Sequence, residues 1–208
     1  MEKVAEYEII GRERKYSGKF GIDELTVKCG DKEFKTEVFD RGGNSVGALV
    51  YNTETKKYLF VEQYRAGAEG MMIEIVAGKV EEGEKTQEAI KREIVEEIGY
   101  KADKIVHISD FYLSPGGSKE IMALFYVEVS EKIGEGGGVD EHENIRVVEV
   151  EDLGLNGNLF FEFPEEGDVT PPYKLIDAKS LMAVSWHVQN KMMKSIWETV
   201  SDFKMKSL

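Results

Sequence analysis

Polar and apolar residues alternate along the first part of the chain in a way that predicts short strands. The alternation occurs in residues 4–10, 25–29 and 34–39, and charged or glycine-containing turns separate these stretches. A period of two places the apolar side chains of a strand on one face. Residues up to about 39 are therefore predicted to form a small antiparallel sheet, which ends at a break over residues 40–44.

Beyond this break, predicted strands and helices follow one another without a regular strand–helix–strand period. Further strands are predicted over residues 45–51, 58–63, 73–77, 105–112, 121–129 and 145–150. The pattern is typical of a mixed α/β chain.

Two stretches have the periodicity of helices. In residues 86–98, three isoleucines recur every fourth residue on one face; Thr86 is expected as the N-cap and Gly99 as the C-terminal stop. A second, longer helix is predicted over residues 178–200. Its apolar stripe consists of Leu181, Val184, Val188, Met192 and Ile196. We interpret this stripe as core packing and not as a ligand site.

Composition limits the classes of partner. The chain has 208 residues, 41% of them hydrophobic, which is enough for a sizeable core. Its 27 basic and 40 acidic residues give a net charge of −13, which argues against nucleic acid or an anionic membrane as the main partner. A small phosphorylated ligand is still compatible with this negative charge if a cation mediates the contact.

The cysteine count and the apolar segments limit the redox chemistry and the location of the protein. Cys29 is the single cysteine, so an intramolecular disulfide and a cysteine-based zinc site are excluded. The start of the chain lacks the apolar segment of a signal peptide, and the longest apolar runs are too short to span a bilayer. We therefore expect a cytoplasmic protein.

Acidic residues are concentrated on the first predicted helix and the loop before it. Residues 81–97 contain seven glutamates and three basic residues. Glu93, Glu96 and Glu97 have the helical spacing that brings three carboxylates to one side. One interpretation is a solvated face, eased by ion pairs with Arg92. The other is a cage of hard oxygen ligands for Mg²⁺ or Mn²⁺.

The residues around these glutamates decide between the two interpretations. Gly78 is followed after five residues by Glu84 and, after seven more, by a segment over residues 92–100 that reads Arg-Glu-Ile-Val-Glu-Glu-Ile-Gly-Tyr. This pattern resembles the box of the Nudix hydrolase family. All nine specified positions over 23 residues are filled, and only Tyr100 is a slightly polar occupant of an apolar position.

The resemblance implies a fold, a cofactor and a set of roles. The fold is an α/β/α sandwich with a mixed sheet over residues 43–208, preceded by a small antiparallel β-sheet domain over residues 1–42 that serves dimerisation or substrate binding. A homodimer is implied. The implied ligands of Mg²⁺ (or Mn²⁺) are Glu93, Glu97, an assisting Glu96 and the carbonyl of Ala77, while Arg92 orients the glutamates. The implied chemistry is attack of water on a diphosphate.

Other segments resemble one branch of the family. Residues 61–65, 73–78 and 114–120 are similar to those of ADP-ribose pyrophosphatases and nucleoside-diphosphate-sugar hydrolases, with Pro115 fifteen residues past Tyr100. By themselves, residues 114–120 could form an ordinary turn, and Arg41 could form a surface ion pair. In this branch, the expected substrate-contacting residues are Arg41, Arg65, Glu74, Pro115, Gly116 and Glu120.

The glycine-rich segment over residues 134–144 predicts a mobile loop before a strand. In the resembled enzymes, a glutamate on this loop is the general base for the attacking water. Glu141 matches that position best and Glu143 is the second candidate. The alternative is a solvent-exposed acidic loop without a catalytic role.

Three functions follow from the resemblance. The first is Mg²⁺-dependent hydrolysis of ADP-ribose to AMP and ribose 5-phosphate. The second is hydrolysis of GDP-mannose or another nucleotide sugar. Residues 136–139 are more similar to the enzymes of this subgroup. The third is a Nudix-fold sensor that binds nucleotide sugars without cleaving them; the intact box disfavours it. In each case the expected partner is a small nucleoside diphosphate sugar.

Overall fold

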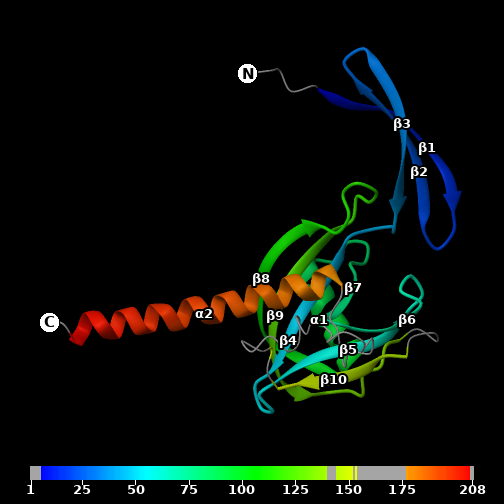
Figure 1. The fold of residues 1–208 in the computed structure, drawn as a ribbon. Helices are drawn as coiled ribbons and strands as arrows, with labels where there is room; N and C mark the ends of the chain where they lie inside the picture. The colour runs from blue at the N-terminus through cyan, green and yellow to red at the C-terminus, as the bar shows by residue number, and fades with distance from the viewer. Residues whose placement is uncertain (1–5, 140–143, 152, 154–176, 207–208) are drawn as a thin grey trace, which may run out of the picture.

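The computed structural model describes residues 6–139, 144–151, 153 and 177–206, and the side chains at 195, 196 and 198–206 are not described. The described residues form a three-stranded sheet, a seven-stranded sheet and two helices (Figure 1). Within the described part of the chain, no helix has both the length and the apolar character needed to cross a membrane.

The N-terminal sheet consists of β1 (Tyr7–Ser17), β2 (Gly21–Cys29) and β3 (Lys32–Asp40), all antiparallel and in that order. The predicted small sheet is thus confirmed, but β1 extends well past residue 10. Its second half is rich in charged residues and carries no apolar alternation. These residues form a strand because Arg12 and Arg14 pair with Asp23 on β2. Figure 1 shows the sheet projecting from the rest of the molecule.

The larger sheet is mixed, as predicted. Its strands are β4 (Ser45–Asn52), β5 (Lys57–Arg65), β6 (Gly70–Glu74), β7 (Val76–Lys79), β8 (Tyr100–Tyr112), β9 (Ile121–Lys132) and β10 (Arg146–Val150). The order is β10-β5-β4-β9-β8, with β6 paired to β5 and β7 paired to β4. Only β4 and β9 run parallel; the other pairs are antiparallel.

The single strand predicted over residues 73–77 is in fact two strands with different partners. β4 and β5 pair only next to their connecting turn, and beyond it they diverge. The chain from Gly70 to Lys79 lies in the opening, first along β5 and then along β4. The partner changes at Ile75, between the end of β6 and the start of β7. We call Glu74 and Ile75 the strand switch. The Ile75 N–H donates to Ser180 Oγ at 2.9 Å, so a side chain replaces the missing ladder bond.

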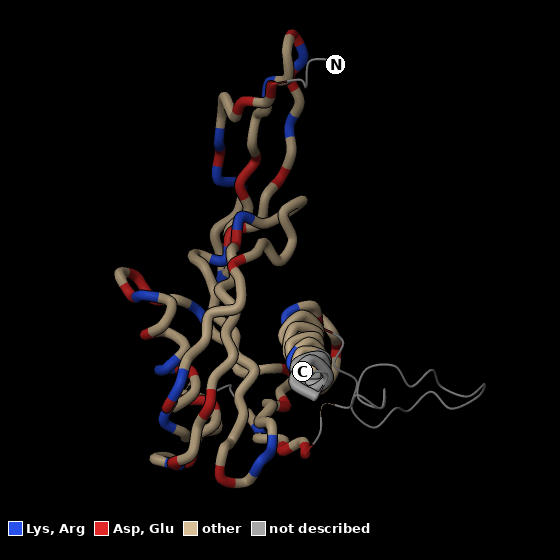
Figure 2. The backbone as a smooth tube through the Cα atoms, turned by 90° about the vertical axis from the view of Figure 1, so that its left-hand side faces the viewer, with Lys and Arg blue, Asp and Glu red and all other residues tan. Residues whose placement is uncertain are grey.

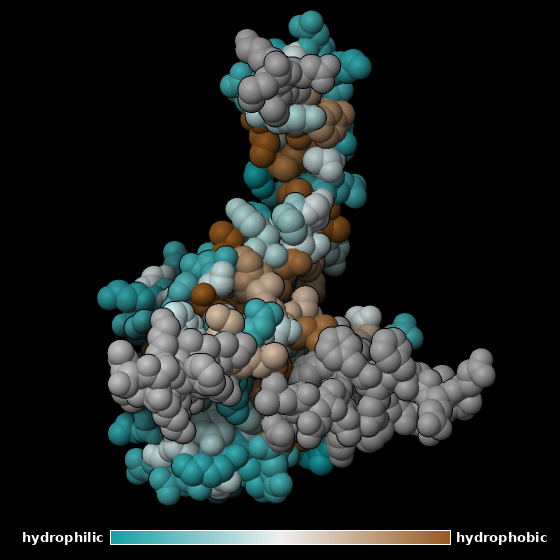
Figure 3. All heavy atoms as spheres, turned by 60° about the vertical axis from the view of Figure 1, so that its left-hand side comes forward, coloured by the Kyte–Doolittle hydropathy of each residue, from teal (hydrophilic) through white to brown (hydrophobic). Residues whose placement is uncertain are grey.

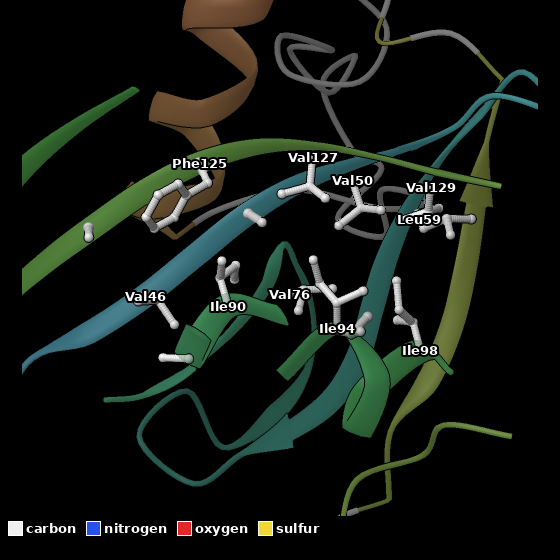
Figure 4. Close-up of a cluster of buried hydrophobic side chains, with 14 of the residues drawn as sticks. Val46, Val50, Leu59, Val76, Ile90, Ile94, Ile98, Phe125, Val127 and Val129 are labelled. Atoms are coloured by element: carbon white, nitrogen blue, oxygen red, sulfur yellow. The ribbon is translucent and has the colours of Figure 1, made fainter. Parts of the chain in front are cut away.

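Helix α1 (Thr86–Ile98) has the predicted bounds and covers one face of the large sheet. It ends at Gly99, which has the left-handed conformation (φ 77°) that glycine adopts readily. Its N-cap is Lys85 and not Thr86, and the Lys85 N–H donates to the Glu88 carboxylate. Figure 4 shows the three isoleucines of α1 against valines of β4, β7 and β9.

Helix α2 (Ala178–Lys206) covers the opposite face, which completes the predicted α/β/α sandwich. Ala183 and Val184 are buried in the second core with Leu49 and Phe60. The predicted core stripe does not continue along the whole helix, because Met192 is 49% exposed. Figure 1 shows the reason: α2 extends past the edge of the sheet, so its later turns have no strands beneath them.

The N-terminal sheet is attached to the turn between β8 and β9. The Phe39 N–H donates to the Gly117 carbonyl at 2.7 Å, and Lys119 pairs with Asp40 at 3.3 Å. Basic and acidic residues alternate along this sheet (Figure 2). The attachment brings the end of β3 to the loop that the sequence assigns to substrate binding.

Candidate active site

The centre of the candidate site is the contact between the β7 backbone and the carboxylate of Glu93. A Cβ added at Gly78 would lie 1.9 Å from Cδ of Glu93, so the carboxylate occupies the space that any other residue would fill. Glu93 itself is buried, with 9% of its surface exposed. A glycine at this position therefore lets the Glu93 carboxylate lie against the strand, and a larger residue would displace that carboxylate.

Glu97 lies one helical turn further along α1 and contacts the same strand. Its Oε2 accepts a hydrogen bond from the Ala77 N–H at 3.2 Å, and the residue is 5% exposed. The helical spacing of four residues places Glu93 and Glu97 side by side on the face that meets β7. The structure thus brings together Ala77, Glu93 and Glu97 as the sequence predicts.

Arg92 connects the remaining glutamates of the box. Its Nη1 donates to Glu93 at 2.8 Å and to Glu96 at 3.0 Å, and its Nη2 donates to Glu84 and to the Lys79 carbonyl. Hydrogen bonds to Glu84 and then to Glu93 raise the pKa of the guanidinium above its already high value. The same bonds hold the pKa of the Glu84 carboxyl below its usual range.

The donor atoms in this cluster suit a hard divalent cation. They are carboxylate oxygens, partly shielded from water, next to backbone atoms of β7, and such oxygens are what Mg²⁺ and Mn²⁺ prefer. Among the residues that the structure describes, no three acidic, histidine or cysteine side chains converge into a complete cation site. Instead, Glu93 and Glu96 share the guanidinium of Arg92.

A second cluster contains two of the predicted substrate residues. Glu74, at the end of β6, is buried, and its Oε2 accepts hydrogen bonds from Nε and Nη2 of Arg65 at 2.9 and 2.5 Å. Its Oε1 is 3.2 Å from Nζ of Lys179. Glu74 is three residues before Ala77, the residue whose N–H donates to Glu97.

A third cluster lies where β3 meets the turn between β8 and β9. Arg41 pairs with the buried Glu120 at 3.5 Å, and its guanidinium lies 5.7 Å from the centre of the Phe20 ring. Pro115 and Gly116 lie within this turn, which the Gly117 N–H closes on the Ser114 carbonyl. The third cluster thus contains Arg41, Pro115, Gly116 and Glu120.

The glycine-rich segment before β10 is tied to the C-terminal end of α1. The N–H groups of Gly137 and Gly138 donate to the carbonyls of Glu97 and Glu96 at 2.9 and 3.0 Å. Gly136, Gly137 and Gly138 all have positive φ values, which brings their amides round to the helix end. The described part of the loop, which we expected to be mobile, therefore caps the glutamate helix. The candidate bases Glu141 and Glu143 lie outside the described residues.

Three residues at the start of α2 belong to the second cluster, and the sequence analysis missed their contacts. They are Asp177, Lys179 and Ser180. Asp177 Oδ1 accepts from the Ser180 N–H at 3.1 Å, which is the N-cap bond of the helix. An aspartate three residues before a serine at a predicted helix start is a signal for this cap, but nothing local reveals the bonds to Glu74 and Ile75.

The sequence pattern of the NUDIX domain matches residues 42–171 of this chain. The chain belongs to the Nudix family. That match confirms the resemblance inferred from the glutamate box, in which Arg92 contacts Glu84, Glu93 and Glu96.

Several known proteins are similar to this Nudix chain. ADP-ribose pyrophosphatase of Bacillus subtilis is 34% identical over 151 residues, which covers 71% of this chain and 80% of that protein. GDP-mannose pyrophosphatase of Cronobacter sakazakii is 36% identical, covering 61% and 70%. ADP-ribose pyrophosphatase of Escherichia coli O157:H7 is 29% identical, but covers 91% and 92%.

A solved structure supports the fold over nearly the whole chain. The crystal structure of an ADP compounds hydrolase superposes with a TM-score of 0.71 and covers 94% of this chain and 98% of that one, at 17% sequence identity. At that identity the similarity concerns the fold alone.

Proposed function

We propose that this chain is a Nudix pyrophosphatase that hydrolyses the diphosphate bond of ADP-ribose or a related nucleoside diphosphate sugar. The products are a nucleoside monophosphate and a sugar phosphate. The observation that carries the proposal is the close contact of the buried Glu93 and Glu97 with the backbone at Gly78 and Ala77. The relatives named as ADP-ribose and GDP-mannose pyrophosphatases support the substrate class.

In this proposal Glu93, Glu96, Glu97 and the Ala77 carbonyl hold Mg²⁺ or Mn²⁺. The cation, when bound, stabilises the negative charge that develops on the phosphoryl oxygens. Arg92 is a positioning residue, since one guanidinium nitrogen contacts both Glu93 and Glu96. It keeps these like charges together before the cation binds.

Two further sets of residues bind the substrate and activate water. Arg65 uses Nε and Nη2 for Glu74 and is partly exposed, so its outer edge is available for a diphosphate oxygen. The third cluster, with Arg41, Pro115, Gly116 and Glu120, contacts the sugar or the second phosphate. Glu141 accepts the proton of the attacking water, with Glu143 as the alternative base.

The test is a panel of nucleotide sugars assayed with Mg²⁺ and with Mn²⁺. We expect ADP-ribose or GDP-mannose to be cleaved to a monophosphate, and Glu97→Gln to lower kcat by roughly a hundredfold or more. Glu82→Gln, which changes an exposed glutamate of the same loop, is the control and keeps wild-type turnover. Comparing Glu141→Gln with Glu143→Gln identifies the base.

The outcomes separate the candidate functions. A higher kcat/KM for GDP-mannose than for ADP-ribose assigns the chain to the second activity. Binding of a nucleotide sugar without turnover under either cation would make the chain a sensor and overturn the proposal. Wild-type turnover in both loop variants would remove the loop glutamates from the mechanism.

We also propose that the chain is a cytoplasmic homodimer in which residues 1–42 form the dimerisation domain and residues 43–208 the hydrolase domain. The N-terminal sheet has three strands, and no helix lies over it in the described structure. Its exposed apolar residues include Tyr7, Ile9, Tyr16 and Phe34. Figure 3 shows apolar surface on the projecting sheet, which a second copy would cover.

A further inference from the structure

The start of α2 is bound to the strand switch by a group of charged and polar side chains. Ser180, which is fully buried, accepts the N–H of Ile75 through its hydroxyl. Lys179 Nζ contacts Glu74 Oε1 at 3.2 Å and donates to Asp177 Oδ1 at 2.9 Å. Consecutive residues of α2 therefore contact consecutive residues of the switch.

Lys179 and Arg65 hold opposite oxygens of one buried carboxylate. Arg65 donates to Oε2 of Glu74 and Lys179 lies against Oε1. The side chain of Lys179 is 11% exposed, so its ammonium group is largely removed from water, and that burial is compensated only by its carboxylate partners. Together with Asp177, the four groups have no net formal charge.

We propose that Lys179 is a positioning residue for substrate binding, which acts on Arg65 through Glu74. This inference rests on the proposed function, in which Arg65 contacts the diphosphate. With both oxygens held, the Glu74 carboxylate has one orientation, and the Arg65 guanidinium bound to it presents a fixed edge to the ligand. The third partner in this arrangement comes from the C-terminal helix, about 105 residues beyond Glu74 along the chain.

Loss of the ammonium group would change that geometry. Oε1 of Glu74 would remain buried without its cationic partner, and the carboxylate could rotate to share both oxygens with Arg65. Arg65 would then be drawn toward Glu74 and away from the diphosphate. The consequence is weaker substrate binding with an intact chemical step, because Glu93, Glu96 and Glu97 are held by α1 and β7.

The experiment compares Lys179→Met with Lys179→Arg and with Lys191→Met in the full chain. We expect Lys179→Met to raise KM for the preferred nucleotide sugar about tenfold while kcat stays within about twofold. Lys179→Arg restores most of the affinity. Lys191→Met is the matched control: it removes a lysine of the same helix that bonds to the Tyr58 hydroxyl, and its KM remains that of the wild type.

A double-mutant cycle distinguishes positioning from a general loss of structure. If Lys179 acts through Glu74, adding Lys179→Met to Glu74→Gln raises KM no further. Additive effects, or equal KM values for Lys179→Met and Lys191→Met, would overturn the inference. Should Lys179→Met not fold, Lys179→Gln takes its place with the same expectation. If the wild type cleaves no nucleotide sugar, the proposed function fails; if it does and KM is unmoved, only the role of Lys179 fails.

Discussion

Gly78 shows how a single residue links the sequence pattern to the site. The strand backbone and the Glu93 carboxylate are so close that no side chain fits between them. The same approach brings Glu97 to the Ala77 N–H. At the scale of the residue, the box is thus a set of contacts between one strand end and one helix face, held together by Arg92.

Gly78→Ala is expected to reduce turnover strongly without unfolding the chain. The added Cβ would meet Glu93 Cδ at 1.9 Å, so the carboxylate must leave its place and kcat falls by roughly a hundredfold. Gly67→Ala is the control, because a Cβ there has no neighbour within 4 Å. Turnover and the urea midpoint are measured for both. Wild-type turnover in Gly78→Ala would show that this contact is dispensable.

At the scale of the element, α2 is held to the sheet by a polar cluster as well as by apolar contacts. The Tyr58 hydroxyl is 2.6 Å from Nε2 of His187 and accepts a hydrogen bond from Lys191 at 2.8 Å. The imidazole also stacks on the ring of Tyr126. Burial, and then the positive charges of Lys191 and Lys194, lower the pKa of His187 to about 4.

Because of this cluster, we expect the free energy of unfolding to fall with decreasing pH already at pH values well above those at which carboxylates titrate. The unfolded chain, with an ordinary histidine pKa near 6.5, binds more protons than the folded chain between pH 6.5 and 4. The stabilisation is present above pH 6.5 and is lost as pH falls toward 4. The free energy of unfolding should fall by about 2 kcal/mol from pH 7 to pH 5 through this residue alone.

Urea unfolding at pH 7, 6 and 5 checks this expectation. His187→Gln should flatten the dependence on pH, whereas His107→Gln, which changes an exposed histidine, should keep it. An equal slope in the wild type and in His187→Gln would contradict the assignment. The measurement tests the attachment of α2, and it does not depend on the enzymatic activity.

At the scale of the whole molecule, two projections carry exposed apolar residues. One is the N-terminal sheet, where Ile9 is 55% exposed; the other is the later part of α2, with Met193 and Trp197. Both extend from the body in Figure 1. The proposed dimer uses the first of these surfaces, because no helix of the described structure covers the N-terminal sheet.

Ile9→Glu is therefore expected to convert the dimer into a monomer. In the proposed interface this carboxylate would be buried without a partner, which costs several kcal/mol. Light scattering after size exclusion gives the mass of the wild type and of the variant. Met193→Glu places the same charge on the other projection and should remain dimeric. A monomeric wild type, or dissociation caused only by Met193→Glu, would contradict this assembly.

The elements that the sequence predicted correctly are those specified by local chemistry. Helix α1 was found with its correct bounds, because three isoleucines at helical spacing end at a glycine that permits a left-handed turn. The resemblance to the Nudix family named Glu93, Glu96 and Glu97 as metal ligands, and this assignment stays a prediction. The N-cap was misplaced by one residue: it is Lys85, whose N–H donates to the Glu88 carboxylate, and not Thr86.

The elements that were predicted incorrectly depend on contacts between segments far apart in the chain. Residues 73–77 read as one strand because the apolar pattern does not change at Ile75, where the hydrogen-bonding partner does. The charged half of β1 became a strand through ion pairs with β2. The stripe on α2 predicted a buried helix along its whole length, but the sheet ends before the helix does.

The sequence by itself determined the family, the mixed α/β class and the glutamate box, because each depends on residue types at short, regular spacings. Only the tertiary structure decided the contacts between distant residues. Glu93 fills the space left by Gly78, the N–H groups of Gly137 and Gly138 cap the end of α1, and Lys179 contacts Glu74. Those contacts join residues far apart in the chain. Their formation depends on how the strands pair and where the helices lie, which no local pattern specifies.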